Sequence, residues 1–75
     1  MADASLRNRL KEARAELGLT QAELAAKVSV SRKTINTVEN GVFVPSTILA
    51  LKLARTLSTT VEKLFYIIEG DERGH

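Results

Sequence analysis

The chain has 75 residues, 44% of them hydrophobic, with a net charge of +2 and no cysteine. This length predicts one domain with a small core, and the lack of cysteine excludes disulfides and thiolate metal sites. The single histidine is the terminal His75, and no apolar run approaches the ~20 residues that span a bilayer. We therefore expect a cytoplasmic protein without a membrane segment, metal, cofactor or small-molecule ligand. An enzyme is not expected, because there is no internal histidine and there are no paired carboxylates in an apolar setting.

The charges are distributed unevenly. Residues 1–55 carry nine Lys or Arg against five Asp or Glu, whereas residues 56–75 carry two against four. The first part is thus +4 and the second −2. A basic body with an acidic tail is compatible with a polyanionic partner, although a solvated mixed-charge surface explains the same counts.

The first predicted helix runs from about Ala4 to Leu17. Its apolar residues recur at helical spacing on one face, and Gly18 follows at the position expected of a left-handed cap. This stripe consists of Leu6, Leu10, Ala13 and Leu17.

The second predicted helix runs from about Gln21 to Val28. Thr20 and Glu23 fit a capping box at its start. The helix is too short to persist alone and must pack against a neighbour.

The third predicted helix follows a short turn. Ser31 is a plausible N-cap, Ile35 and Val38 point inward, and the helix stops at Gly41. Its opposite arc is polar, rich in hydrogen-bond donors and free of carboxylates. This polar arc consists of Arg32, Lys33, Asn36, Thr37 and Asn40.

Two further helices are predicted. Ser46 can cap a helix that continues to about Leu57 and is apolar on more than one stripe, so it is either central to the core or contacts a second subunit. Thr60 can cap a short fifth helix. The apolar residues after it exceed the needs of a small core, so residues 66–68 either extend this helix, burying Ile68, or form a strand that pairs with a second copy.

Helix, tight turn and helix, with a polar face on the second helix, is the helix-turn-helix arrangement. Ala25 is small where the two helices would cross, and Val30 would fill the gap between them. The segment "LGLTQAELAAKVSVSRKTINTVENG" resembles the Cro/C1-type (Xre) family of phage repressors and small bacterial regulators, and "PSTILALKLARTLSTTVEKLF" resembles the fourth and fifth helices of that family. The resemblance covers about residues 6–65.

The resemblance implies an all-α, compact, five-helix lambda-repressor-like domain over residues 1–65, followed by a tail over residues 66–75 that we expect to serve dimerisation and to end in a frayed acidic segment. It implies double-stranded DNA as the partner. Residues matching those that read base edges are Arg32, Lys33, Asn36 and Thr37. Residues expected to contact phosphate are Gln21, Ser31, Thr34 and Asn40. Capping remains an alternative role for Ser31 and Asn40.

Two further expectations come from the same resemblance. Arg14 and Glu39 match a structural ion pair that sets the angle of the third helix. Ser29 and Ser58 stand where glycine is common, at positions that favour a left-handed backbone, which costs each serine about 1 kcal/mol.

The favoured function is a small transcriptional regulator, a homodimer that reads a palindromic operator and associates with the nucleoid when bound. The alternative is an antitoxin or another protein-interaction module on the same fold. The expected dimer interface comprises Leu49, Leu53, Tyr66, Ile67 and Ile68.

Overall fold

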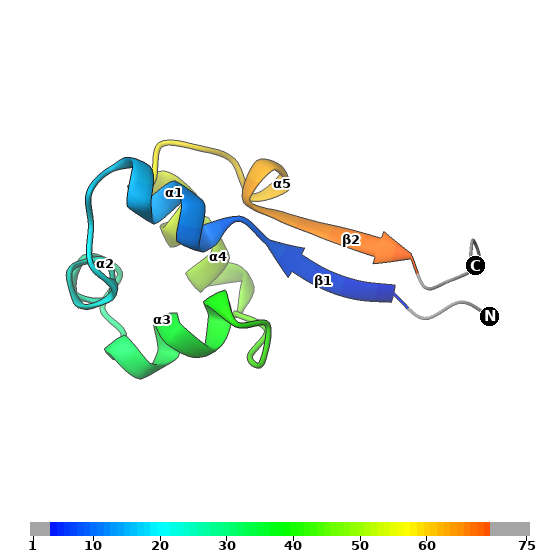
Figure 1. Cartoon of the computed structure of the whole chain (residues 1–75), viewed down its shortest axis with the longest axis horizontal. Coiled ribbons are helices and arrows are strands. Elements are labelled where there is room, and N and C mark those ends of the chain that lie inside the picture. The colour runs from blue at the N-terminus through cyan, green and yellow to red at the C-terminus, as the bar shows by residue number, and fades with distance from the viewer. Residues whose placement is uncertain (1–3, 70–75) are drawn as a thin grey trace.

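The computed structural model describes residues 4–69 as five helices and one two-stranded sheet. In Figure 1 the helices gather at one end, and the two strands project from them as a ribbon. No helix between residues 4 and 69 has both the length and the apolar character needed to cross a membrane. In chain order the elements are β1 (Ala4–Asn8), α1 (Leu10–Glu16), α2 (Gln21–Lys27), α3 (Arg32–Glu39), α4 (Thr47–Thr56), α5 (Val61–Leu64) and β2 (Phe65–Glu69).

The core lies where the five helices converge. Its members are all apolar. Burial of this surface is the main force that holds such short helices in place. The core consists of Leu10, Leu24, Ala25, Val28, Ile35, Val38, Leu49, Leu53, Ala54, Leu57, Leu64 and Phe65.

The four predicted N-caps are confirmed. In each, a hydroxyl oxygen accepts a hydrogen bond from the backbone N–H three residues later, which satisfies a donor that the helix itself leaves unpaired. Thr20 also receives the reciprocal contact of a capping box, because its backbone N–H donates to Glu23 Oε1 at 2.8 Å. The four caps are Thr20, Ser31, Ser46 and Thr60.

The prediction of a helix beginning near Ala4 is wrong, because residues 4–8 form β1 and α1 begins only at Leu10. Asn8 accounts for the late start: its side-chain Oδ1 accepts a hydrogen bond from Leu10 N at 3.0 Å, an Asx turn that opens the helix. The prediction of five helices is confirmed, whereas the all-α description is only roughly correct.

Of the two forms predicted for the tail, the strand is confirmed and the helical extension is wrong, because α5 ends at Leu64 and β2 begins at Phe65. The strand partner differs from the prediction, because β2 pairs antiparallel with β1 of the same chain. The register places Leu6 opposite Ile67 and Asn8 opposite Phe65. The predicted frayed acidic end beyond Glu69 lies outside the described residues.

Both serines that were expected in a left-handed backbone have positive φ. Ser29, in the turn between α2 and α3, has φ 63°, and Ser58, after α4, has φ 57°. A side chain in this region meets its own backbone carbonyl, which glycine avoids. The turn between α2 and α3 therefore has the left-handed residue expected of a helix-turn-helix, but with serine in place of the common glycine.

Candidate nucleic-acid interface

Helix α3 is seated on α2 by a small set of apolar contacts. Ala25, near the end of α2, is buried where a larger side chain would separate the helices, and Val30 packs against the core from the turn. The Val30 N–H donates to Ala25 O at 3.0 Å, which closes the turn. Ile35 and Val38 are buried beneath α3. The opposite side of α3 is therefore turned outward.

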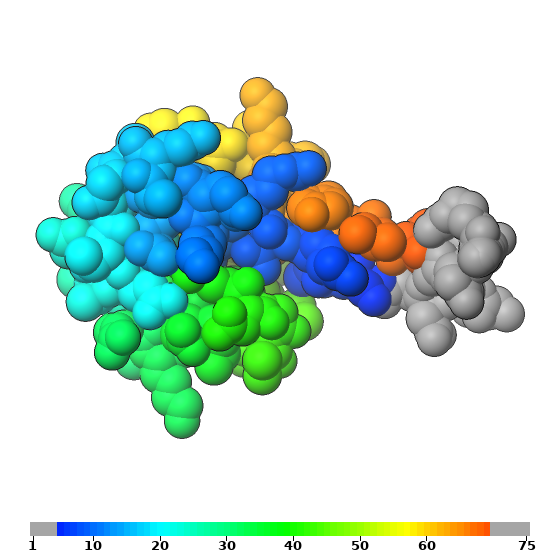
Figure 2. All heavy atoms as spheres, in the orientation of Figure 1, coloured from blue at the N-terminus to red at the C-terminus, as the bar shows by residue number. Residues whose placement is uncertain are grey.

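The outward side of α3 carries positive charge at its beginning. Arg32, Lys33, Asn36 and Asn40 are exposed, and Thr37 is half-buried. The charged ends of Arg32 and Lys33 have no hydrogen-bond or ion-pair partner within residues 4–69. In Figure 2, green spheres near the start of α3 protrude from the lower edge of the helical body. The two cations are thus available to a ligand.

The hydroxyl and amide groups on this face are partly engaged. Thr37 Oγ1 donates to Thr34 O at 2.9 Å, so its methyl group is the part left for outside contacts. Asn40 Nδ2 donates to Asn36 Oδ1 at 3.3 Å, which aligns the two amides. Ser31 Oγ accepts from Thr34 N at 3.1 Å, so capping is its role within the fold.

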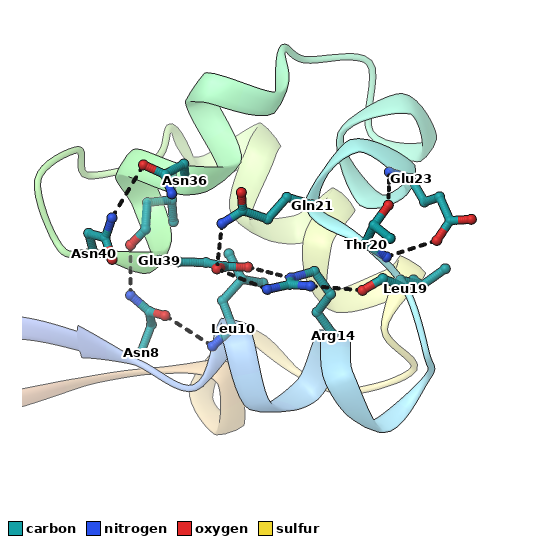
Figure 3. Close-up of polar contacts among 11 residues, drawn as sticks. Asn8, Leu10, Arg14, Leu19, Thr20, Gln21, Glu23, Asn36, Glu39 and Asn40 are labelled. Carbon is teal, nitrogen blue, oxygen red and sulfur yellow. Dashed lines mark hydrogen bonds and ion pairs between the residues drawn. The ribbon is translucent and has the colours of Figure 1, made fainter.

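Glu39 joins α3 to α1 and α2 (Figure 3). Its carboxylate accepts from Arg14 Nε at 2.6 Å and from Arg14 Nη2 at 3.3 Å, the two-pronged geometry that suits a planar guanidinium. The Glu39 side chain is 3% exposed. The hydrogen bond to Glu39, aided by the charge attraction, raises the pKa of Arg14 against the opposing effect of burial. The structure thus brings this predicted pair together.

Gln21, which is predicted to contact phosphate, forms a hydrogen bond within the fold. Its Nε2 donates to Glu39 Oε1 at 3.0 Å, so the side chain is directed at the carboxylate within the fold. Arg14 Nη1 also donates to Leu19 O at 2.8 Å, just before α2. Gln21 therefore helps Arg14 to hold Glu39, and with it the end of α3, in place. The sequence patterns did not reveal this contact.

Asn8 is a residue of this region that the sequence analysis missed. Its Nδ2 donates to Val38 O at 2.9 Å, which satisfies a carbonyl at the end of α3. Figure 3 shows its side chain reaching from β1 towards the last turn of α3. An asparagine just before a helix is a signal for an Asx turn, but the helical spacing of Leu6 and Leu10 obscured it.

The expected dimer-interface residues do not share one surface. The structure corrects two of them, because Leu49 and Leu53 are buried in the core of their own chain. The exposed apolar residues of α4 are instead Ile48 and Leu51, at 68% and 57% exposure.

On the ribbon, Ile67 is 63% exposed and Ile68 is 37% exposed, whereas Tyr66 is half-buried. The Arg9 guanidinium lies 4.3 Å from the centre of the Tyr66 ring, a cation–π contact. Between ribbon and helices runs an apolar groove of about 310 Å³. Its lining includes Leu6, Pro45, Ala50, Leu51, Val61 and Phe65.

Comparison with known proteins agrees with this geometry. A family model described as helix-turn-helix matches residues 10–64, the span from α1 to α5. The chain is 39% identical over 64 residues to YgzD of Bacillus subtilis, named as an uncharacterised HTH-type transcriptional regulator, with 85% of this chain and 97% of that protein aligned. It is 48% identical over 60 residues to a regulator similarly named from Archaeoglobus fulgidus, covering 80% and 86% of the two chains. The structure of the restriction-modification controller protein C.AhdI from Aeromonas hydrophila gives a TM-score of 0.69 at 34% identity, over 73% of this chain and 83% of that one.

Proposed function

Because the chain belongs to the helix-turn-helix family of Cro/C1-type DNA-binding transcriptional regulators, we propose that it binds double-stranded DNA sequence-specifically by inserting α3 into the major groove. The observation that carries this proposal is the outward side of α3. It presents two unpartnered cations at its beginning, while Glu39, the one acid on the helix, is buried against Arg14. A phosphate-lined groove therefore meets no free carboxylate on this helix.

The base-reading residues in this proposal are Arg32, Lys33, Asn36 and Thr37. Arg32 has the fork geometry for O6 and N7 of guanine, and Lys33 can reach the same acceptors as a point donor. Asn36 suits N6 and N7 of adenine, and the Thr37 methyl suits the methyl group of thymine. Each good two-bond contact discriminates against the wrong base by about 1–3 kcal/mol.

In this proposal, the phosphate contacts lie at the start of α2 and at both ends of α3. Ser31 and Thr34 expose hydroxyl oxygens near the start of α3, and Asn40 exposes an amide at its end. Gln21 retains one side-chain N–H beyond its bond to Glu39, because an amide nitrogen carries two. Such contacts fix the position of the protein on the duplex but carry no sequence information.

We infer that two copies act together on a palindromic operator. A dimer would place two α3 helices about 34 Å apart, one turn of the duplex. The exposed Ile48 and Leu51 on α4, with Ile67 on the ribbon, supply apolar surface that a single small domain leaves uncovered. These exposed residues replace the buried Leu49 and Leu53 in the proposed dimer interface.

The test is a selection of binding sites from random duplexes, carried out with the wild-type protein and with Arg32→Ala. We expect a palindromic motif with the wild type and loss of preference at one base position of each half-site with the variant. The absence of any enriched motif would contradict the proposal. If a partner protein co-purified as well, the alternative of an antitoxin or interaction module would replace it.

A further inference from the structure

An open hollow of about 560 Å³ separates β1 from the C-terminal end of α3. Its walls are closely connected, because Asn8 of β1 donates to Val38 O of α3 at 2.9 Å. Figure 3 shows Asn8 and Asn40 on the two sides of this junction. The polar residues that line the hollow include Ser5, Arg7, Asn8, Glu39, Asn40 and Tyr66.

Arg7 determines the electrostatic character of this hollow. It is the only Lys or Arg among the described residues that line it, and its exposed guanidinium has no partner within residues 4–69. Arg9, by contrast, lies over the Tyr66 ring and donates to Lys63 O at 3.4 Å. Glu39 offers little opposing charge, because Arg14 pairs with its carboxylate. The hollow therefore presents one free positive charge.

The end of α3 needs such a charge if DNA passes close to it. A helix C-terminus carries partial negative charge from its unpaired carbonyls, which repels phosphate. The last turn of α3 contains no basic residue, and residues 41–46 contain none either. Neither the last turn of α3 nor the loop after it can therefore attract a phosphate by charge.

The length of α3 brings its end towards the rim of the groove. Eight residues of α-helix are about 12 Å long, which is about the width of the major groove. If Arg32 and Lys33 at the start of α3 contact bases, the other end lies roughly one groove width away. The phosphate backbone borders the groove there, beside the hollow that contains Arg7.

We propose that Arg7 binds a backbone phosphate of the DNA at the C-terminal end of α3, so that the β1–β2 ribbon takes part in DNA binding. This inference rests on the proposed function. The strand that supplies Arg7 lies outside the span matched by the helix-turn-helix family model. The contact is electrostatic and independent of base sequence, and it complements the base contacts at the other end of α3.

The experiment compares Arg7→Gln with Lys63→Gln by fluorescence anisotropy on the selected operator and on a random-sequence duplex, over a series of salt concentrations. Lys63 is an exposed cation on α5, and the hollow it lines contains no residue of α3. Loss of one phosphate contact lowers the slope of log affinity against log salt by about 0.9 per half-site, or about fivefold in affinity at about 0.15 M salt. We expect this loss for Arg7→Gln on both duplexes, wild-type behaviour for Lys63→Gln, and substantial recovery with Arg7→Lys.

Two results would overturn the inference. One is an unchanged salt slope for Arg7→Gln, and the other is an equal loss for Lys63→Gln, which would indicate a general charge effect. Circular dichroism would verify that each variant is folded before binding is compared. Failure of the wild type to bind any duplex would instead contradict the proposed function, so the two ideas fail by different results.

Discussion

Replacing Glu39 by glutamine should destabilise the fold and loosen α3 together. The substitution keeps the size of the side chain but removes its charge, and it puts an amide N–H₂ group in place of one of the two oxygens. That group then faces either Arg14 Nε or both Arg14 Nη2 and Gln21 Nε2, all of which are donors. Hydrogen bonds to a charged group contribute about 1.5–3 kcal/mol each, and breaking a fully buried ion pair costs about 3–5 kcal/mol. Arg14 keeps its bond to Leu19 O and its side chain is 15% exposed, so we expect a loss of about 2–3 kcal/mol.

That loss is large for a chain of this size. A 75-residue domain has a free energy of unfolding of roughly 4–11 kcal/mol. Each kcal/mol shifts Tm by about 4–8 °C in domains of similar length, so Tm should fall by about 10–20 °C. Thermal and urea unfolding followed by circular dichroism would measure both quantities. The matched control is Glu16→Gln, an exposed glutamate on α1, which should change stability by less than about 0.5 kcal/mol.

A double-mutant cycle with Arg14→Gln would isolate the pair. We expect a coupling energy of at least about 1 kcal/mol between Arg14 and Glu39, because they share two hydrogen bonds. Glu39→Gln should also bind DNA more weakly at a temperature where it remains folded. A coupling below about 0.5 kcal/mol, or unchanged stability and DNA affinity in Glu39→Gln, would show that the pair does not hold α3.

Three further predictions, which use five substitutions, test other parts of the structure. Ser29→Gly and Ser58→Gly should each raise the free energy of unfolding by about 0.5–1 kcal/mol. Glycine relieves a left-handed strain of about 1–2 kcal/mol, which exceeds the effect of the added entropy of the unfolded chain. A lower free energy of unfolding in urea would contradict this prediction. Asn8→Ala should lower the free energy of unfolding by about 1–2 kcal/mol, because it removes the hydrogen bond that opens α1 and the hydrogen bond to the end of α3. Urea unfolding unchanged from wild type would count against this role of Asn8. Leu51→Glu should abolish the proposed dimer in sedimentation experiments without unfolding the chain. Leu53→Glu should instead unfold the chain, because Leu53 is buried. A Leu51→Glu variant that still dimerises would exclude the α4 face as the contact.

The helix-turn-helix could be predicted because its signals are local. Caps such as Thr20 and Ser31 lie within three residues of the amides that they satisfy, and the buried positions of α3 recur at helical spacing. The left-handed turn at Ser29 was likewise expected from the family pattern and has the expected φ.

The ribbon could not be predicted in the same way. Leu6 is four residues before Leu10, which fits a helix, but its partner in the sheet is Ile67, far away in the chain. The apolar–polar alternation of Ala-Ser-Leu-Arg in β1 is too short to decide between helix and strand, and neither strand's sequence indicates its distant partner. The apolar stripes of α4 posed a related problem. Several of its faces are apolar, and spacing alone did not separate the buried Leu53 from the exposed Leu51.

The contacts of α3 divide it into two ends with different roles. Its last turn is fastened to three other elements, through Arg14 of α1, Gln21 of α2 and Asn8 of β1. Within residues 4–69, the side-chain hydrogen bonds of its first turn are local ones of Ser31 and Thr34, and its two cations have no partner. Ordering the backbone of α3 in advance lowers the entropy lost on binding, while the exposed side chains at its first turn are not held by other contacts within residues 4–69. The residues that hold the C-terminal end of α3 come from β1, α1 and the start of α2, so its first turn, which carries the proposed base-reading residues, is left accessible to a ligand.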